Sequence, residues 1–219
     1  MIKKLFLITI FAPSCCNFFA QESINDVGIE LIDEFLNKVI TFDSKFDQSL
    51  IDINGFTAEA VTGTLEIERS KNKFRWSYSE PYKQWLIADG LNIWNYDVDL
   101  GEVIVKPQKD ALAGTPAILL SGSESIFEKF KLNSVSILEK TTWVQLVPRD
   151  NLKFKWVKLG FIDRQLSKMT FLDNLDQKTL INFYDVKQNQ SIDPTRFEFI
   201  AFDDVDLIGI PATNNSKNK

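Results

Sequence analysis

Apolar and polar residues alternate one by one, in segment after segment, from residue 42 to about residue 200, and this periodicity constrains the fold most. In the first segment Phe42, Ser44 and Phe46 share one side, with charged residues between them. In the next, Leu65 and Ile67 share a side. Because successive side chains of a strand point to opposite faces of the sheet, this pattern predicts half-buried strands. Strands are expected over 42–50, 61–67, 74–78, 84–88, 92–97, 102–106, 134–139, 142–148, 153–160, 165–172, 178–187 and 196–202.

Short polar connections join these segments, and Asp89-Gly90, Glu139-Lys140 and residues 173–176 are typical of hairpin turns. About ten to twelve antiparallel strands without a long linker predict a single strongly curved sheet, a barrel or half-barrel. The chain is therefore expected to form one mainly β domain over residues 21–210, followed by a flexible polar tail over residues 211–219.

Helical patterns occur in two places. Apolar residues recur at three- and four-residue spacing after Ser23, which begins an S-x-x-D capping box, and this predicts an amphipathic helix over 24–41. Two shorter helices are expected over 115–120 and 123–131, with Thr115 as the N-cap of the first. We expect these helices to cover the concave side of the sheet.

The first twenty residues have the pattern of a secretory signal peptide. Two lysines near the start precede a run from Leu5 to Ala20 without a charge, which is shorter than the ~20 residues of a membrane span. Cleavage after Ala20 would place Phe18 at the −3 position, where signal peptidases prefer small residues. Cleavage near Ser14 or Cys16 is therefore an alternative. A second alternative is lipidation of Cys15, because residues 12–15 loosely resemble a lipobox.

Composition argues against several function classes. Histidine is absent, which excludes Ser-His-Asp and Cys-His catalysis and His-ligated zinc. The formal net charge of −5 does not favour general nucleic-acid binding. Nucleotide-binding and nucleophile-elbow motifs are missing, and the acidic pieces 97–99 and 203–206 are typical of solvated turns rather than metal sites. The sequence thus predicts no enzyme, no cofactor and no metal, although a carboxylate pair from distant strands is not excluded.

Arg69 and the strand Phe74-Arg75-Trp76-Ser77-Tyr78 each allow two interpretations. Arg69 falls on the apolar side of its strand, and either the strand ends before it and the guanidinium reaches water, or the guanidinium binds carbonyls at the end of a covering helix. The aromatic strand is either ordinary core or one wall of an apolar cavity that encloses a lipid.

Three ordered blocks resemble the LolA family of periplasmic outer-membrane lipoprotein carriers. They are Lys73-Phe74-Arg75-Trp76-x-Tyr78-x-x-Pro81, Ala88-Asp89-Gly90-x-x-x-Trp94-x-Tyr96-Asp97-x-Asp99-Leu100-x-x-Val103, and Thr115-Pro116-Ala117-Ile118-Leu119-Leu120. The resemblance extends from the first helix to about residue 208. It departs from the family pattern at Ser70, where a proline is usual, and at one extra residue within 70–73.

This resemblance implies an open, strongly curved antiparallel barrel of about eleven strands with a helical lid over an acyl-chain cavity. It implies that Arg69 is the lid latch and that Phe74 takes part in cargo transfer. Lipid-binding residues are expected at Leu65, Ile67, Phe74, Trp76 and Met169, and lid residues at Leu31, Phe35, Ile118 and Leu120.

The implied function is that of a monomeric periplasmic chaperone for acylated lipoproteins. It would accept them from an inner-membrane Lol ABC release complex and pass them to an outer-membrane receptor like LolB. Alternatives are a lipid-anchored acceptor of LolB type, with residues 17–22 as a tether, a sensor domain of the same fold, and an enzyme acting on lipid.

Overall fold

The structure is a computed structural model that describes residues 16–112, 119, 126–150, 152–200 and 205–213, and for 16–23 and 112 the backbone only. The helices are α1 (Cys16–Asp33), the π-helical turn η1 (Glu34–Lys38), η2 (Arg69–Lys71), α2 (Gln108–Leu112), α4 (Ile126–Lys129) and η3 (Pro194–Phe197). The strands are β1 (Thr41–Ile51), β2 (Thr57–Glu68), β3 (Lys73–Glu80), β4 (Gln84–Ala88), β5 (Asn92–Asp97), β6 (Glu102–Pro107), β7 (Phe130–Leu138), β8 (Thr141–Pro148), β9 (Phe154–Ile162), β10 (Gln165–Asp173), β11 (Lys178–Gln188) and β12 (Asp206–Ile208).

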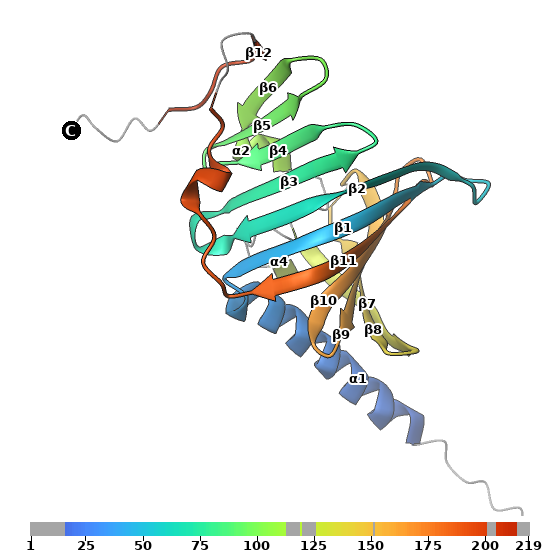
Figure 1. Cartoon of the computed structure of the whole chain (residues 1–219). Coiled ribbons are helices and arrows are strands. Elements are labelled where there is room, and N and C mark those ends of the chain that lie inside the picture. The colour runs from blue at the N-terminus through green and yellow to red at the C-terminus, as the bar shows by residue number, and fades with distance from the viewer. Residues whose placement is uncertain (1–15, 113–118, 120–125, 151, 201–204, 214–219) are drawn as a thin grey trace, which may run out of the picture.

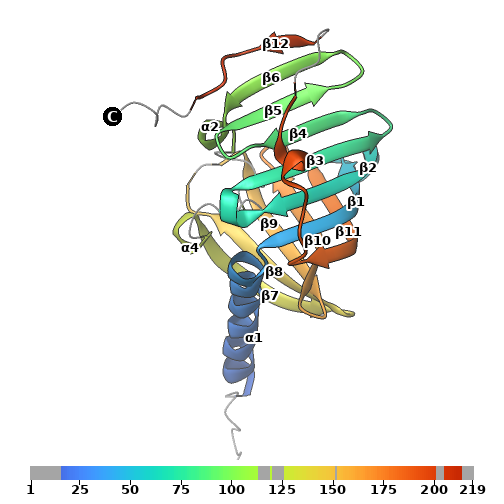
Figure 2. The same cartoon turned by 60° about the vertical axis from the view of Figure 1, so that its left-hand side comes forward.

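All these strands belong to one curved sheet in the order β12-β6-β5-β4-β3-β2-β1-β11-β10-β9-β8-β7. Antiparallel pairing joins β1 to β11, while β12 adds to the edge of β6 in the parallel direction. The two end strands, β7 and β12, do not pair with each other, so the sheet is open, as Figure 1 and Figure 2 show. The prediction of a mainly β, open and strongly curved sheet covered by short helices is confirmed.

Most expected strands coincide with observed ones, but the strand expected over 196–202 is wrong for residues 196–200, and residues 201–202 lie outside the described residues. Residues 194–197 form η3, because Pro194 stands in its first turn and the side chain of Asp193 accepts a hydrogen bond from the Thr195 amide. Phe197 is fully buried there, so its apolar character reflects packing of the turn and not strand alternation. The short strand near the C-terminus is β12 instead.

The first helix begins earlier and ends sooner than predicted. Ser23 lies inside α1 and does not cap its start, because the helix already runs through the preceding residues from Cys16. We name α1 and η1 together the cover helix; it ends at Lys38, and β1 begins at Thr41. Figure 2 shows the cover helix crossing the lower end of the curled sheet.

The helices expected over 115–120 and 123–131 are only partly described. Leu119 is helical, and the rest of the first segment lies outside the described residues. The second segment ends sooner than expected, because α4 ends at Lys129 and Phe130 already pairs with Pro148 as the first residue of β7; residues 123–125 lie outside the described residues. The structure also contains α2, which the sequence pattern did not indicate.

Candidate functional site

The concave face of β2 and β3 is an apolar wall. Cross-strand pairing places Leu65 opposite Trp76 and Ile67 opposite Phe74, and all four side chains are at most 7% exposed. Met169 of β10 is buried in the same hydrophobic cluster. The structure thus brings the five side chains expected to bind lipid into one continuous apolar interior.

Phe42 and Phe46 extend this wall onto β1. The Phe46 ring lies 5.1 Å from that of Trp76 between centroids. Phe46 pairs with Gly63, where a Cβ atom would lie 2.0 Å from the Ser77 carbonyl oxygen and 2.8 Å from the Phe46 ring, so only glycine leaves room for the ring. Strand alternation in the sequence had placed Phe42 and Phe46 on the same side of their strand, so the sequence pattern could have identified both as part of the wall.

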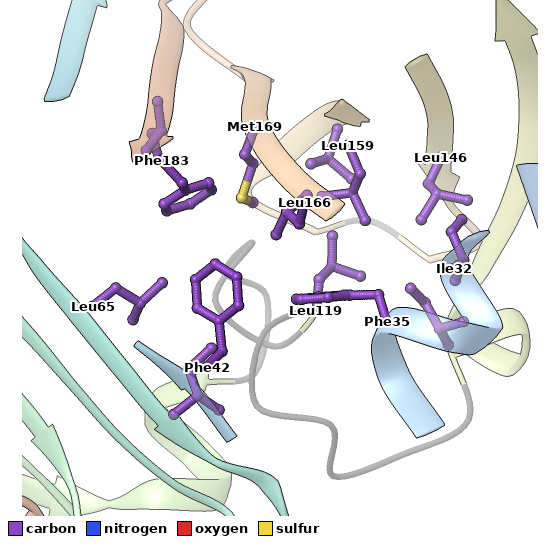
Figure 3. Packing of buried hydrophobic residues seen from close by; sticks show 14 of the residues in the cluster. Ile32, Phe35, Phe42, Leu65, Leu119, Leu146, Leu159, Leu166, Met169 and Phe183 are labelled. Carbon is purple, nitrogen blue, oxygen red and sulfur yellow. The ribbon is translucent and has the colours of Figure 1, made fainter. Parts of the chain in front are cut away.

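The cover helix closes one end of this interior with Leu31, Ile32 and Phe35, which are at most 3% exposed. The Phe35 ring contacts Phe42 of β1, at 5.9 Å between centroids, and Phe161 of β9, at 6.3 Å. Figure 3 shows Phe35 and Ile32 pointing toward side chains from β8, β9 and β10, with Leu119 in the same cluster. The expected lid residues Ile118 and Leu120 lie outside the described residues.

Arg69 connects the sheet to the end of the cover helix. Strand β2 ends at Glu68, yet the Arg69 side chain does not reach water, because the residue is only 7% exposed. Its Nε donates a hydrogen bond to the Val39 carbonyl at 2.9 Å, and its guanidinium lies 4.4 Å from the centre of the Phe35 ring. Burial lowers the pKa of Arg69 to about 10, so the group stays charged at neutral pH.

Asn189 holds the same chain segment from the other side. Its Oδ1 accepts a hydrogen bond from the Ile40 amide at 2.7 Å, and its Nδ2 donates to the Lys38 carbonyl at 3.0 Å. Its backbone has a φ of +57°, which asparagine tolerates better than most residues. Nothing in the sequence indicated this contact, because Asn189 lies 149 residues from Ile40.

An exposed ionic cluster fastens the outer side of the cover helix. Arg164, in the turn between β9 and β10, contacts Glu30 at 2.8 Å and Glu34 at 2.6 Å, and Lys38 contacts Glu34 at 3.0 Å. Hydrogen bonds from Lys38 and Arg164 lower the pKa of Glu34. Beside this cluster lies a polar cleft of about 560 Å³, which Gln188 and Asn189 also line.

Within the described ranges, acidic side chains form no group of three or more that would hold a metal ion. For the same part of the chain, no helix is both long and apolar enough to cross a membrane.

Comparison with known proteins decides the family. The sequence model described as "Outer membrane lipoprotein carrier protein LolA" matches residues 37–200, three quarters of the chain. The chain belongs to the LolA family. A curated outer-membrane lipoprotein carrier protein from Nitrosomonas europaea is 35% identical over 183 residues, which cover 83% of this chain and 88% of the relative.

A second relative agrees with this assignment, and one solved structure shares the fold. A protein of the same name from Coxiella burnetii is 33% identical over 205 residues, covering 92% of this chain and 95% of the relative. The crystal structure of an uncharacterized conserved protein from Thermus thermophilus shares the fold at a TM-score of 0.54 and 13% identity, covering 84% and 98% of the two chains. The LolA resemblance of the three sequence blocks is thereby confirmed.

Proposed function

We propose that this LolA-family protein is a periplasmic chaperone that holds the acyl chains of lipoproteins against its concave face. The observation that carries the proposal is the continuous apolar interior beneath the cover helix, to which β1, β2, β3, β10 and the helix itself contribute buried side chains. Membership of the LolA family supports it, since the curated relatives carry the name of outer-membrane lipoprotein carriers.

The same interior explains how such a carrier releases its cargo. Three acyl chains hold about forty-five methylenes, and each gains roughly 0.8 kcal/mol on leaving water. A rigid site that covered all of that surface would bind the cargo too tightly to release it. We propose that the empty carrier offers a competing closed state, in which Phe35 packs on Phe42 and Arg69 binds the Val39 carbonyl, and that cargo displaces these contacts.

In this proposal Arg69 is the latch, and the cover helix with residues around Leu119 is the lid. The partners are an inner-membrane Lol ABC release complex and an outer-membrane receptor like LolB, and the protein acts as a monomer without catalysis. Residues 1–20 are the export signal, residues 21–210 the carrier domain, and residues 211–219 a polar tail. A shuttle is favoured over a LolB-type anchored acceptor, because Pro13 and the short apolar run weaken the lipobox match of residues 12–15.

Purification of the exported protein from cells tests the proposal. We expect diacyl- or triacyl-modified N-terminal peptides to copurify with the wild type and to be lost from Phe74→Glu, which places a charge in the apolar wall. The matched control is Phe56→Glu, because Phe56 is 71% exposed at the tip of the β1–β2 hairpin. Retention of the peptides by a Phe74→Glu variant that unfolds cooperatively would remove Phe74 from the site, and their absence from the wild type would refute the carrier function.

A further inference from the structure

Two buried polar groups on the concave wall have no hydrogen-bond partner among the described residues. They are the hydroxyl of Ser44, a residue that is 2% exposed, and the indole Nε1 of Trp76, which is 7% exposed. A buried donor without a partner loses its bonds to water and gains nothing in return, so such groups are rare in folded proteins. Two of them on one apolar face call for an explanation.

Register places the two groups in one row across the sheet. Ser44 of β1 pairs with Leu65 of β2, and Leu65 pairs with Trp76 of β3. Directly paired residues of antiparallel strands lie about 4.5–5.5 Å apart, so Ser44 and Trp76 flank Leu65 at similar spacing on either side. Both face the interior that we propose for acyl chains.

The strand beside Ser44, β11, is irregular at this point, and Asp185 there has a φ of +52°. Pairing between β1 and β11 moves from Asp43 with Lys187 to Lys45 with Tyr184, so two residues of β11 stand opposite Ser44 alone. Such a bulge interrupts the ladder between β1 and β11 and bends β11, which carries the extra residue, and bulges are frequent beside binding sites. The irregularity therefore coincides with the unpaired hydroxyl.

We infer that Ser44 Oγ and Trp76 Nε1 form a polar subsite that donates hydrogen bonds to the ester carbonyl oxygens of a diacylglyceryl group. This inference rests on the proposed function. Ester carbonyls are the polar acceptors nearest to the acyl chains, and two donors match two esters. The donors are unpaired in the empty carrier and paired in the loaded one, so they favour loading and fix how deep the glyceryl group enters.

A matched pair of ligands tests the subsite. The probes are a short N-terminal peptide whose cysteine carries a di-palmitoyl ester of glycerol and the same peptide with two hexadecyl ether chains, which lack the carbonyls. We expect the wild type to bind the diester about tenfold more tightly, as two hydrogen bonds of ordinary net strength provide. Ser44→Ala and Trp76→Phe should each lower this ratio by a few fold, and the double variant should bring it close to one.

Trp85→Phe is the matched control, because Trp85 lies under the Arg75 guanidinium on the opposite face of the sheet. The Trp85→Phe substitution should leave the ratio of diester affinity to diether affinity unchanged. Equal binding of diester and diether by the wild type, or an unchanged ratio in Ser44→Ala, would overturn the subsite while leaving the carrier function in place. Failure of both ligands to bind would overturn the carrier function itself.

A phospholipid with the same two palmitoyl esters identifies the source of the carbonyls. Binding that shows the same loss in Ser44→Ala supports the subsite and extends it to any diacylglyceryl lipid. Stability gives an independent check: removal of an unpaired hydroxyl should leave the thermal midpoint of the empty Ser44→Ala protein at or above that of the wild type. A clearly lower midpoint would mean that the hydroxyl is paired and would overturn the inference.

Discussion

At the scale of single residues, alternation in the sequence was sufficient to find the apolar wall. Period alone placed Leu65 and Ile67 on one side of their strand and Phe74 and Trp76 on one side of theirs, and the structure buries all four. It was not sufficient for Arg69, since the same pattern allowed a guanidinium in water or a guanidinium bound to carbonyls. The acceptor, the Val39 carbonyl, has no sequence signature because every residue carries one.

Arg69→Leu should weaken closure of the cover helix without unfolding the barrel. The change removes a charged hydrogen bond of about 1.5–3 kcal/mol, whereas the buried leucine needs no polar partner. Hydrogen exchange of the Val39 amide, which donates to the Glu34 carbonyl, should become at least about tenfold faster. Loaded carrier should accumulate and deliver cargo slowly to an acceptor.

The control for this prediction is Arg75→Leu, because Arg75 lies on the outer side of the sheet over Trp85. In Arg75→Leu, the hydrogen exchange of the Val39 amide and the rate of cargo delivery should both match those of the wild type. A wild-type rate of delivery by Arg69→Leu would show that Arg69 is not the latch.

At the scale of elements, the period of the pattern identified β4 and β5 to the residue, but the end of the cover helix depended on the strand after it. The cover helix ends before residue 41 because Thr41 already pairs with Glu68 in the sheet. The strand expected over 196–202 shows the opposite failure, since Phe197, which begins the alternating apolar residues, belongs to the turn η3.

The ionic cluster on the cover helix predicts a pH dependence. The pKa of Glu34 is lowered below its ordinary value of 4.5, so its contribution to closure is present above that pH and is lost as the pH falls through the lowered value. Resonances of Glu34 followed by NMR should therefore titrate below pH 4.5 in the wild type and shift upward in Arg164→Gln. Added salt should reduce the difference between the Glu34 midpoints of the wild type and Arg164→Gln, since the Arg164 side chain is exposed and salt screens its charge. A wild-type midpoint at or above 4.5 would contradict the prediction.

At the scale of the whole molecule, the C-terminal segment crosses the outer face of the sheet and ties distant strands together. Arg196 of η3 binds both carboxylate oxygens of Glu66 on β2, with its shortest contact at 2.6 Å, while Arg75 of β3 donates to the Arg196 carbonyl. Phe199 stacks on Trp94 of β5 at 5.0 Å between ring centroids. The open sheet is thus braced from outside, and its interior is left for the cover helix.

Phe197→Ala should undock this segment and lower the free energy of unfolding by about 3 kcal/mol, the usual cost of deleting a buried ring. Phe197 is fully buried, whereas Ile200 in the same segment is 68% exposed. Ile200→Ala should therefore change the free energy by less than about 0.5 kcal/mol. Urea denaturation measures both, and equal effects of the two substitutions would show that the segment does not brace the sheet.

The sequence by itself determined most of the strands, the turns between them and the side of each of these strands that is buried, because side-chain direction in a strand follows position along the chain. The motif blocks also determined the family. Only the tertiary structure decided which carbonyl Arg69 binds, that Asn189 meets residues 38–41, and that Ser44 and Trp76 are left unpaired. These contacts join segments far apart in the chain, and local periodicity contains no information about which distant groups the curvature of the sheet brings together.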